Sequence, residues 1–180
     1  MTIVINSNAL RRNVQFGMNI LKIADSKFEI ADLFIPSAAW KGGAIVPRIA
    51  FSLTQNQMRH CFDSSAGFTL PNGAVRAPDA AWVLREKWDA LTKEERMKFA
   101  PVVPNFVIEN RSQSETVRQQ KSKMEEYLAA GVQLGWLIDP FDRKVHIYRQ
   151  SEQPKVLEDP ASVSGDPELP GFVLDLTQVW

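Results

Sequence analysis

A strand–helix–strand pattern between residues 105 and 138 constrains the fold of this 180-residue chain more than any other feature. Residues 105–109 contain a short apolar run that predicts a buried strand, and Leu134–Ile138 is a second run of this kind. The segment between them predicts a helix that stops at Gly131. A unit of this kind indicates a right-handed crossover connection between two parallel strands.

Further strands are predicted on both sides of this unit. Phe62–Leu70 and Val75–Leu84 are separated by an Asn72-Gly73 turn, so they predict a hairpin. Val145–Tyr148 alternates between apolar and polar residues, which predicts a half-exposed strand with His146 at the surface. Together these elements predict an α/β fold (an α+β mixed sheet flanked by helices) that forms a single domain over residues 1–180.

The helices carry recognisable start signals. Glu86–Phe99 contains the spacing Thr92-x-x-Glu95, a capping box that predicts two short helical pieces rather than one helix. For the longer helix, Ser112 or Ser114 is the predicted N-cap. The positions predicted to face the core on the longer helix are Val117, Met124 and Leu128.

Composition excludes several classes of protein. The formal net charge is zero, so binding to nucleic acid would need a local basic surface rather than the charge of the whole molecule. The single cysteine, Cys61, excludes an internal disulfide. No run of about 18 apolar residues predicts a membrane span, and the first residues lack the pattern of a secretory signal. We therefore expect a cytoplasmic protein.

Two carboxylates stand at the edges of apolar runs. Asp79 immediately precedes the run Ala80–Leu84, and Glu109 immediately follows Phe106–Ile108. A charge at the edge of a core is costly unless it is offset, and a bound cation such as Mg²⁺ is one common offset. With Lys123 on the following helix, the two acids would suit metal-dependent hydrolysis of a phosphodiester. From residue types alone, acids that simply face water are the commoner arrangement.

Five segments in a fixed order carry a resemblance to a known family. These are Arg76–Val83, Phe106–Ser112, Lys123–Tyr127, Leu134–Pro140 and Leu169–Leu176. They resemble the second class of the Uma family of putative restriction endonucleases, a branch of the PD-(D/E)XK nuclease superfamily. The likeness covers about residues 62–180, whereas the region from about 13 to 60 departs from the family pattern.

The resemblance implies a restriction-endonuclease-like core that cleaves DNA with Mg²⁺ or Mn²⁺. Asp79 and Glu109 would be the metal carboxylates, and Lys123 would act on water and phosphate charge, with Lys121 as the runner-up. The superfamily normally has its lysine two residues after the second acid, where this chain has Arg111. Arg111 would carry part of the charge stabilisation, but a guanidinium is a poor base.

The atypical region, residues 1–60, bears on whether the site is complete. The family has an accessory acid on an early helix, and Glu29 is the match for it. The departure from the pattern is abrupt, which suggests a local reading-frame change in the gene; translation of the other frames over these codons would test this.

The alternative function is a catalytically inactive nuclease-fold protein that binds DNA or a partner. We also expect a homodimer.

Overall fold

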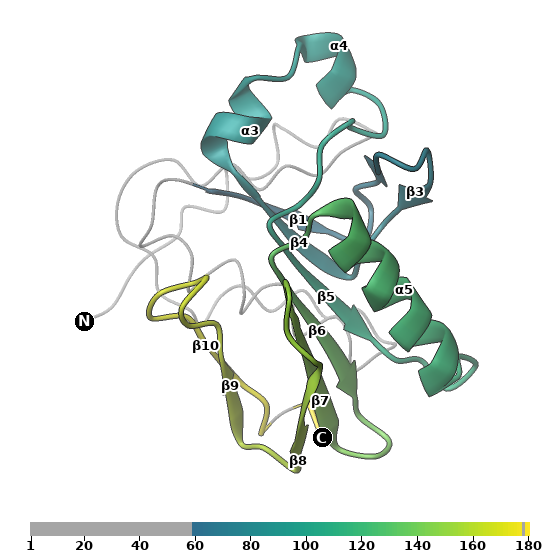
Figure 1. The fold of residues 1–180 in the computed structure, drawn as a ribbon, viewed down its shortest axis with the longest axis vertical. Coiled ribbons are helices and arrows are strands. Elements are labelled where there is room, and N and C mark those ends of the chain that lie inside the picture. Colours follow the sequence, from purple (N-terminus) through teal and green to yellow (C-terminus); the bar gives the residue numbers. More distant parts are fainter. Residues whose placement is uncertain (1–58, 178) are drawn as a thin grey trace, which may run out of the picture.

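A six-stranded mixed sheet carries the fold in the computed structural model, which describes residues 59–177 and 179–180. The strands follow the order β1-β4-β5-β6-β7-β8 across the sheet, and every neighbouring pair is antiparallel except β5 and β6 (Figure 1). The strands of this sheet are β1 (Arg59–Asp63), β4 (Ala80–Leu84), β5 (Phe106–Asn110), β6 (Leu134–Asp139), β7 (Lys144–Arg149) and β8 (Lys155–Glu158). The predicted mixed sheet with flanking helices is confirmed.

The predicted crossover unit is present. Strand β5 pairs in parallel with β6, with Phe106 opposite Leu134, and helix α5 (Val117–Ala130) connects them. The helix ends where the sequence predicts, because Gly131 adopts a left-handed conformation with a φ of 107°. Since a parallel connection must return the chain to the same end of the sheet, α5 lies along one face of β5 and β6.

The predicted hairpin is present only in outline. Each of its two strands is divided, so that β1 pairs with β4 while β2 (Phe68–Thr69) pairs with β3 (Val75–Arg76) in a separate small sheet. Pro78 explains one break, because it has no N–H to donate to a ladder. The turn between β2 and β3 is as predicted, with Gly73 at a φ of 83°.

The predicted capping box at Thr92 is confirmed. Thr92 accepts from the backbone N–H of Glu95, and the Glu95 side chain accepts in return from the backbone N–H of Thr92. The chain therefore forms two short helices, α3 (Arg85–Asp89) and α4 (Lys93–Arg96), before it enters β5.

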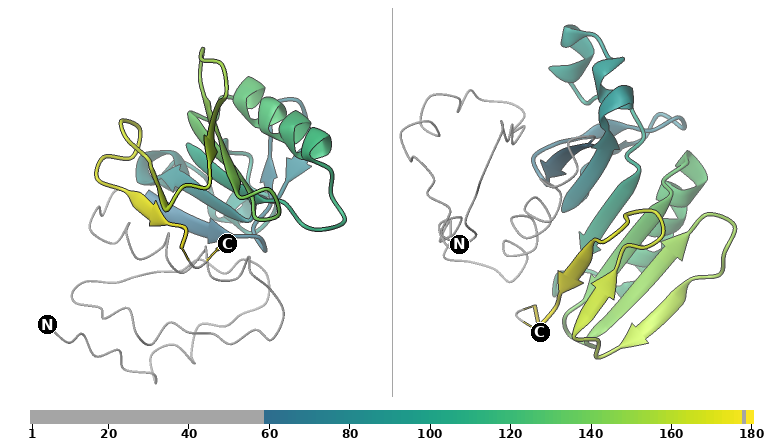
Figure 2. Two further views of the ribbon diagram at one scale, coloured as in Figure 1. Left: turned by 90° about the horizontal axis from the view of Figure 1, so that it is seen from below. Right: turned by 90° about the vertical axis from the view of Figure 1, so that its left-hand side faces the viewer.

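Two layers cover opposite faces of the sheet, as Figure 2 shows. Helix α5 covers one face, and the hairpin of β9 (Ser162–Ser164) and β10 (Val173–Asp175) covers the other with the C-terminal segment. Strand β7 is consequently buried on both faces. The predicted surface position of His146 is therefore wrong: its side chain faces α5 and the residue is 5% exposed. No helix in the described part of the chain is long and apolar enough to cross a membrane.

Helix α5 begins one turn later than predicted from its serines. Its N-cap is Thr116, whose hydroxyl accepts from the backbone N–H of Gln119, while the Gln119 side chain accepts from the Thr116 N–H at 3.0 Å. Ser112 instead donates to the carboxylate of Glu115, and Ser114 contacts only Ser112 among the hydrogen bonds of this turn. The Thr-x-x-Gln capping box outcompetes the two serines because it satisfies two backbone groups at once.

The Thr116 cap leads to a first prediction. Thr116→Ala removes one side of the capping box, so we expect the free energy of unfolding to fall by about 1 kcal/mol. The matched control is Ser114→Ala, which removes an exposed hydroxyl two residues earlier and should change stability by less than about 0.5 kcal/mol. Urea denaturation of both variants measures the difference. Equal losses would show that the helix does not depend on Thr116.

Candidate active site

Asp79 and Glu109 meet at one end of the β4–β5 pair. Ala80 lies opposite Ile108 in the ladder, so the next positions along the two strands are Asp79 and Glu109. The Asp79 carboxylate accepts a hydrogen bond from the backbone N–H of Asn110, with 2.7 Å between Oδ2 and N. This bond holds the Asp79 carboxylate against the peptide group that follows Glu109.

The Glu109 side chain points toward α5 and is bound there at both oxygens. Lys123 Nζ donates to Oε2 at 2.7 Å, and the Tyr127 hydroxyl donates to Oε1 at 2.9 Å. Glu109 is only 3% exposed, so this carboxylate is removed from water and depends on these two donors. The alternation of β5 explains the orientation, because Val107 belongs to the core under α5 and Glu109 faces the same side.

The carboxylates also influence each other electrostatically. Burial is the main cause that raises the pKa of Glu109, the charge of Asp79 adds to it, and Lys123 and the Tyr127 hydrogen bond oppose it, so that the net pKa is about 7. Burial likewise raises the pKa of Asp79, while the Asn110 hydrogen bond and the charge of Lys123 oppose that rise. The two acids and the ammonium therefore form one electrostatic unit, in which Lys123 acts on the buried carboxylate of Glu109 and on the half-buried carboxylate of Asp79.

The structure brings Lys123 to the acids and leaves Lys121 elsewhere. Lys121 is exposed, and its charge acts on His146, where it helps burial to lower the histidine pKa. The reason is the orientation of α5. Its buried side consists of Gln120, Met124 and Tyr127, so the prediction is confirmed for Met124, whereas Val117 and Leu128 are only partly buried. With this rotation Lys123 flanks the buried side next to Glu109.

Arg111 forms an ion pair with Asp139. Its guanidinium donates twice to Asp139, with Nε–Oδ2 and Nη2–Oδ1 distances of 2.8 Å each. It also lies over the ring of Phe141, 4.6 Å from the ring centre. The side chain that stands at the superfamily's lysine position thus links the end of β5 to the end of β6, and its hydrogen bonds go to Asp139 and to the Glu115 carbonyl.

Two residues of the site were not among the predicted site residues. Tyr127 holds Glu109, and burial together with the charge of Glu109 raises the phenol pKa, so the hydroxyl stays protonated as a donor. Glu115 lies near enough for its charge to raise the pKa of Asp79. Tyr127 could have been found from its spacing, because it is four residues after Lys123 and so on the same side of the helix. Glu115 gives no such signal, since it lies in the turn before α5.

The donor set fits a hard divalent cation. Mg²⁺ typically uses one or two protein carboxylates and completes its shell with water and phosphate oxygens, and Asp79 and Glu109 match that requirement. Within residues 59–177 and 179–180, no group of three or more histidine, cysteine or acidic side chains could hold a metal ion. The accessory candidate Glu29 lies outside the described residues.

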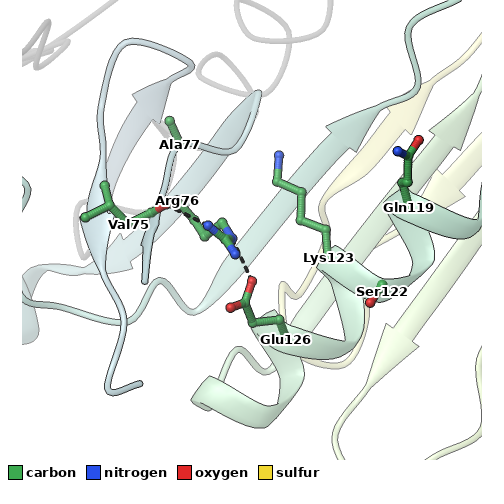
Figure 3. A pocket seen from close by; sticks show the side chains of 7 residues that line it. All are labelled: Val75, Arg76, Ala77, Gln119, Ser122, Lys123 and Glu126. Carbon is green, nitrogen blue, oxygen red and sulfur yellow. Dashed lines mark hydrogen bonds and ion pairs between the residues drawn. The ribbon is translucent and has the colours of Figure 1, made fainter. Parts of the chain in front are cut away.

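An open groove of about 760 Å³ leads up to Lys123, as Figure 3 shows. One wall is the segment around β3 and the other is α5, and Arg76 and Glu126 pair between them. The lining residues are Val75, Arg76, Ala77, Gln119, Ser122, Lys123 and Glu126. The site is therefore approached from solvent along the side of α5.

Comparisons with known proteins identify a family and a similar fold. A family model for Uma2, described as "Putative restriction endonuclease", matches residues 25–177. The match begins well upstream of residue 62, so it includes Glu29 and part of the region that seemed atypical. A crystal structure of a putative nuclease belonging to DUF820 from Anabaena variabilis is similar in fold, with a TM-score of 0.66 and 20% sequence identity. The alignment covers 78% of this chain and 80% of that chain. No curated protein matches the sequence.

Proposed function

The chain belongs to the Uma2 family of putative restriction endonucleases, and on this premise we propose that it is a divalent-cation-dependent endonuclease that hydrolyses phosphodiester bonds of DNA. One observation carries the proposal: a buried carboxylate, Glu109, is bound by Lys123 and lies next to a second carboxylate, Asp79, whose position is fixed by a backbone hydrogen bond. A catalytic role of these three side chains explains why a buried acid, a half-buried acid and a lysine gather at one end of the sheet.

Asp79 and Glu109 are the residues that would hold the ion. A bound Mg²⁺ or Mn²⁺ would act as a Lewis acid on the phosphate and lower the pKa of a nearby water. The protein prepares this site in advance, because the Asn110 N–H fixes Asp79 and the Tyr127 hydroxyl fixes Glu109. Rigid support of this kind keeps both carboxylates in place without substrate.

Lys123 is the residue proposed to act on the phosphate. Its side chain is 27% exposed and borders the groove, so its ammonium contacts Glu109 on one side and is open to solvent on the other. An ammonium has three donors, and only one bond, to Glu109, is made among the described residues. A phosphate oxygen arriving from the groove would accept one of the others, which stabilises negative charge as it develops.

Incubation of supercoiled plasmid with the protein tests the function. We expect cleavage with Mg²⁺ or Mn²⁺ and none in excess chelator, and Asp79→Asn should behave like the chelated sample. Glu152→Gln, on an exposed turn after β7, is the control and should cleave as the unmodified protein does. Undiminished cleavage by Asp79→Asn would refute the site.

The same assay distinguishes the proposed nuclease from the alternative function, which is DNA binding without cleavage. If no metal supports cleavage while the protein still shifts DNA in a gel, the chain is a DNA-binding module with a nuclease fold rather than an enzyme.

The expected homodimer is an independent proposal, and sedimentation velocity would measure it directly.

A further inference from the structure

The groove beside Lys123 offers hydrogen-bond donors and few free acceptors. Both carboxylate oxygens of Glu126 are already bound, Oε1 by Asn72 Nδ2 at 2.9 Å and Oε2 by Arg76 Nε at 2.6 Å. The Gln119 oxygen is bound as well, by the backbone and hydroxyl of Thr116 at 3.0 and 2.8 Å. The strongest acceptors along the groove are therefore committed to neighbours within the protein.

Both walls of the groove carry hydrogen-bond donors that bind none of the described residues. Arg76 has five N–H donors, of which Nε binds Glu126 and one on Nη1 binds the Val75 carbonyl at 3.0 Å, and the other N–H groups bind none of the described residues. On α5, the Gln119 amide nitrogen and the Ser122 hydroxyl also line the groove. A ligand with several acceptors, negative charge and no donors matches this surface.

We propose that the groove between β3 and α5 binds a backbone phosphate of the DNA strand next to the phosphate that is cleaved, with Arg76 as its main contact. The proposal rests on the proposed function, since it places the substrate relative to Lys123. Figure 3 shows the basis for this: Arg76 and Lys123 extend from opposite walls toward the same groove. Two cations on facing walls would hold a strand in position while its sequence is read elsewhere.

Glu126 gives the proposal a distinctive consequence. Its carboxylate lies against Arg76 in the groove, and its side chain is 24% exposed, so its charge repels a phosphate that approaches Arg76. Glu126→Gln removes that repulsion and retains an oxygen that can accept from Arg76. DNA affinity should therefore rise. If Arg76 served only to tie β3 to α5, the same variant would leave affinity unchanged or lower it.

Fluorescence anisotropy with a short labelled DNA duplex tests the proposal in an Asp79→Asn background, which prevents cleavage during the titration. We expect Arg76→Met to weaken binding about 10-fold, the effect of losing one hydrogen bond to a charged group. The slope of log K against log salt concentration should also decrease by about 0.9, the value for one phosphate contact. Lys155→Met, on the exposed edge strand β8, is the charge-matched control and should change neither quantity.

The outcomes separate this proposal from the proposed function. An unchanged salt slope in Arg76→Met, with thermal melting showing a folded protein, would overturn the groove assignment even if the enzyme cleaves DNA. Conversely, a reduced slope in Arg76→Met, together with no plasmid cleavage by the protein without substitutions, would support the groove and refute the nuclease. Weaker binding by Glu126→Gln would also count against the groove, because the repulsion it removes would then be absent.

Discussion

Replacing Glu109 with glutamine is expected to abolish DNA cleavage while making the protein more stable above pH 7. Glutamine keeps the shape of the side chain and can still accept from Tyr127, but it removes the charge that would hold a cation. Loss of a residue that only hydrogen-bonds to a metal ligand typically lowers metal affinity or activity by roughly 10–100-fold. For the ligand itself we expect the cleavage rate to fall by more than about 100-fold.

The gain in stability follows from the pKa of Glu109. Burial raises this pKa from 4.5 to about 7, so the folded state binds the proton more tightly than the unfolded chain does. Below pH 4.5 the carboxyl is protonated in both states and costs nothing. Between pH 4.5 and 7 the unfolded chain ionises first, and stability falls with rising pH. Because one pKa unit corresponds to about 1.4 kcal/mol, the ionised carboxylate costs the folded state about 3 kcal/mol above pH 7.

Urea denaturation in the presence of chelator measures this effect without interference from bound metal. At pH 9 we expect Glu109→Gln to be more stable than the unmodified protein by up to about 3 kcal/mol, and at pH 4 the two should be equally stable. Glu152→Gln makes the same chemical change on an exposed turn and should show no such pH dependence. A variant that loses both activity and stability at pH 9 would mean that Glu109 is a structural ion pair rather than a prepared metal site.

The parts of the fold that could be predicted are those fixed by local chemistry. The parallel pair β5–β6 and the end of α5 follow from two apolar runs and a glycine that takes a positive φ. The division of the hairpin was missed because Val75–Leu84 was interpreted as one strand, although Pro78 within it has no N–H to donate to a ladder. The N-cap at Thr116 was missed because three hydroxyl residues compete within five positions, and only the reciprocal bond from Gln119 decides among them.

The burial of His146 depends on elements far from it in sequence. Its strand alternates as an exposed strand would, yet α5 and the C-terminal segment cover both faces of β7. Alternation predicts which residues share a face but not whether a second layer covers it. The same limit applies to Tyr127, whose hydroxyl finds its partner only when the helix is docked on the sheet.

The candidate site was predictable to different degrees for its three members. Asp79 and Glu109 could be identified because each interrupts an apolar run at its end, and adjacent strands bring such ends together. The family resemblance favoured Lys123. The predicted helix orientation, with Val117, Met124 and Leu128 toward the core, favoured Lys121 instead, and that orientation was only partly correct. The structure places Lys123 against Glu109, whereas the catalytic roles of all three stay predictions. Glu29 lies outside the described residues.

The residue type of Arg111 did not reveal its partner. At the position of the superfamily lysine, a guanidinium suggested charge stabilisation at the catalytic site, and that role stays a prediction. The structure pairs Arg111 with Asp139, whose side chain is 1% exposed and accepts both parallel N–H bonds. Burial alone would raise the pKa of Asp139, but Arg111 and two backbone amides outweigh it, so the net pKa is lowered. The pair therefore contributes stability above pH 4.

Arg111→Ala is expected to lower the free energy of unfolding by about 3–5 kcal/mol at pH 7, because it leaves the Asp139 carboxylate buried without its cation. The backbone N–H groups of Phe141 and Asp142 still donate to Oδ1, which favours the lower end of that range. The matched control is Arg143→Ala, which breaks an ion pair with Asp159 that is more than half exposed on both sides. That change should cost no more than about 1 kcal/mol.

The pH dependence distinguishes this pair from general loss of packing. Since the pKa of Asp139 is lowered in the folded state, its contribution is present above about pH 4 and is lost as the pH falls through the folded value. The stability difference between Arg111→Ala and the unmodified protein should therefore shrink in acid. The Glu109→Gln difference also vanishes in acid, but its sign is opposite, because Glu109→Gln is the more stable protein at high pH. Arg111→Lys should recover only part of the loss, because an ammonium cannot reproduce the two parallel bonds. A difference that stays constant from pH 7 to 3 would assign the loss to the contact of Arg111 with Phe141 instead.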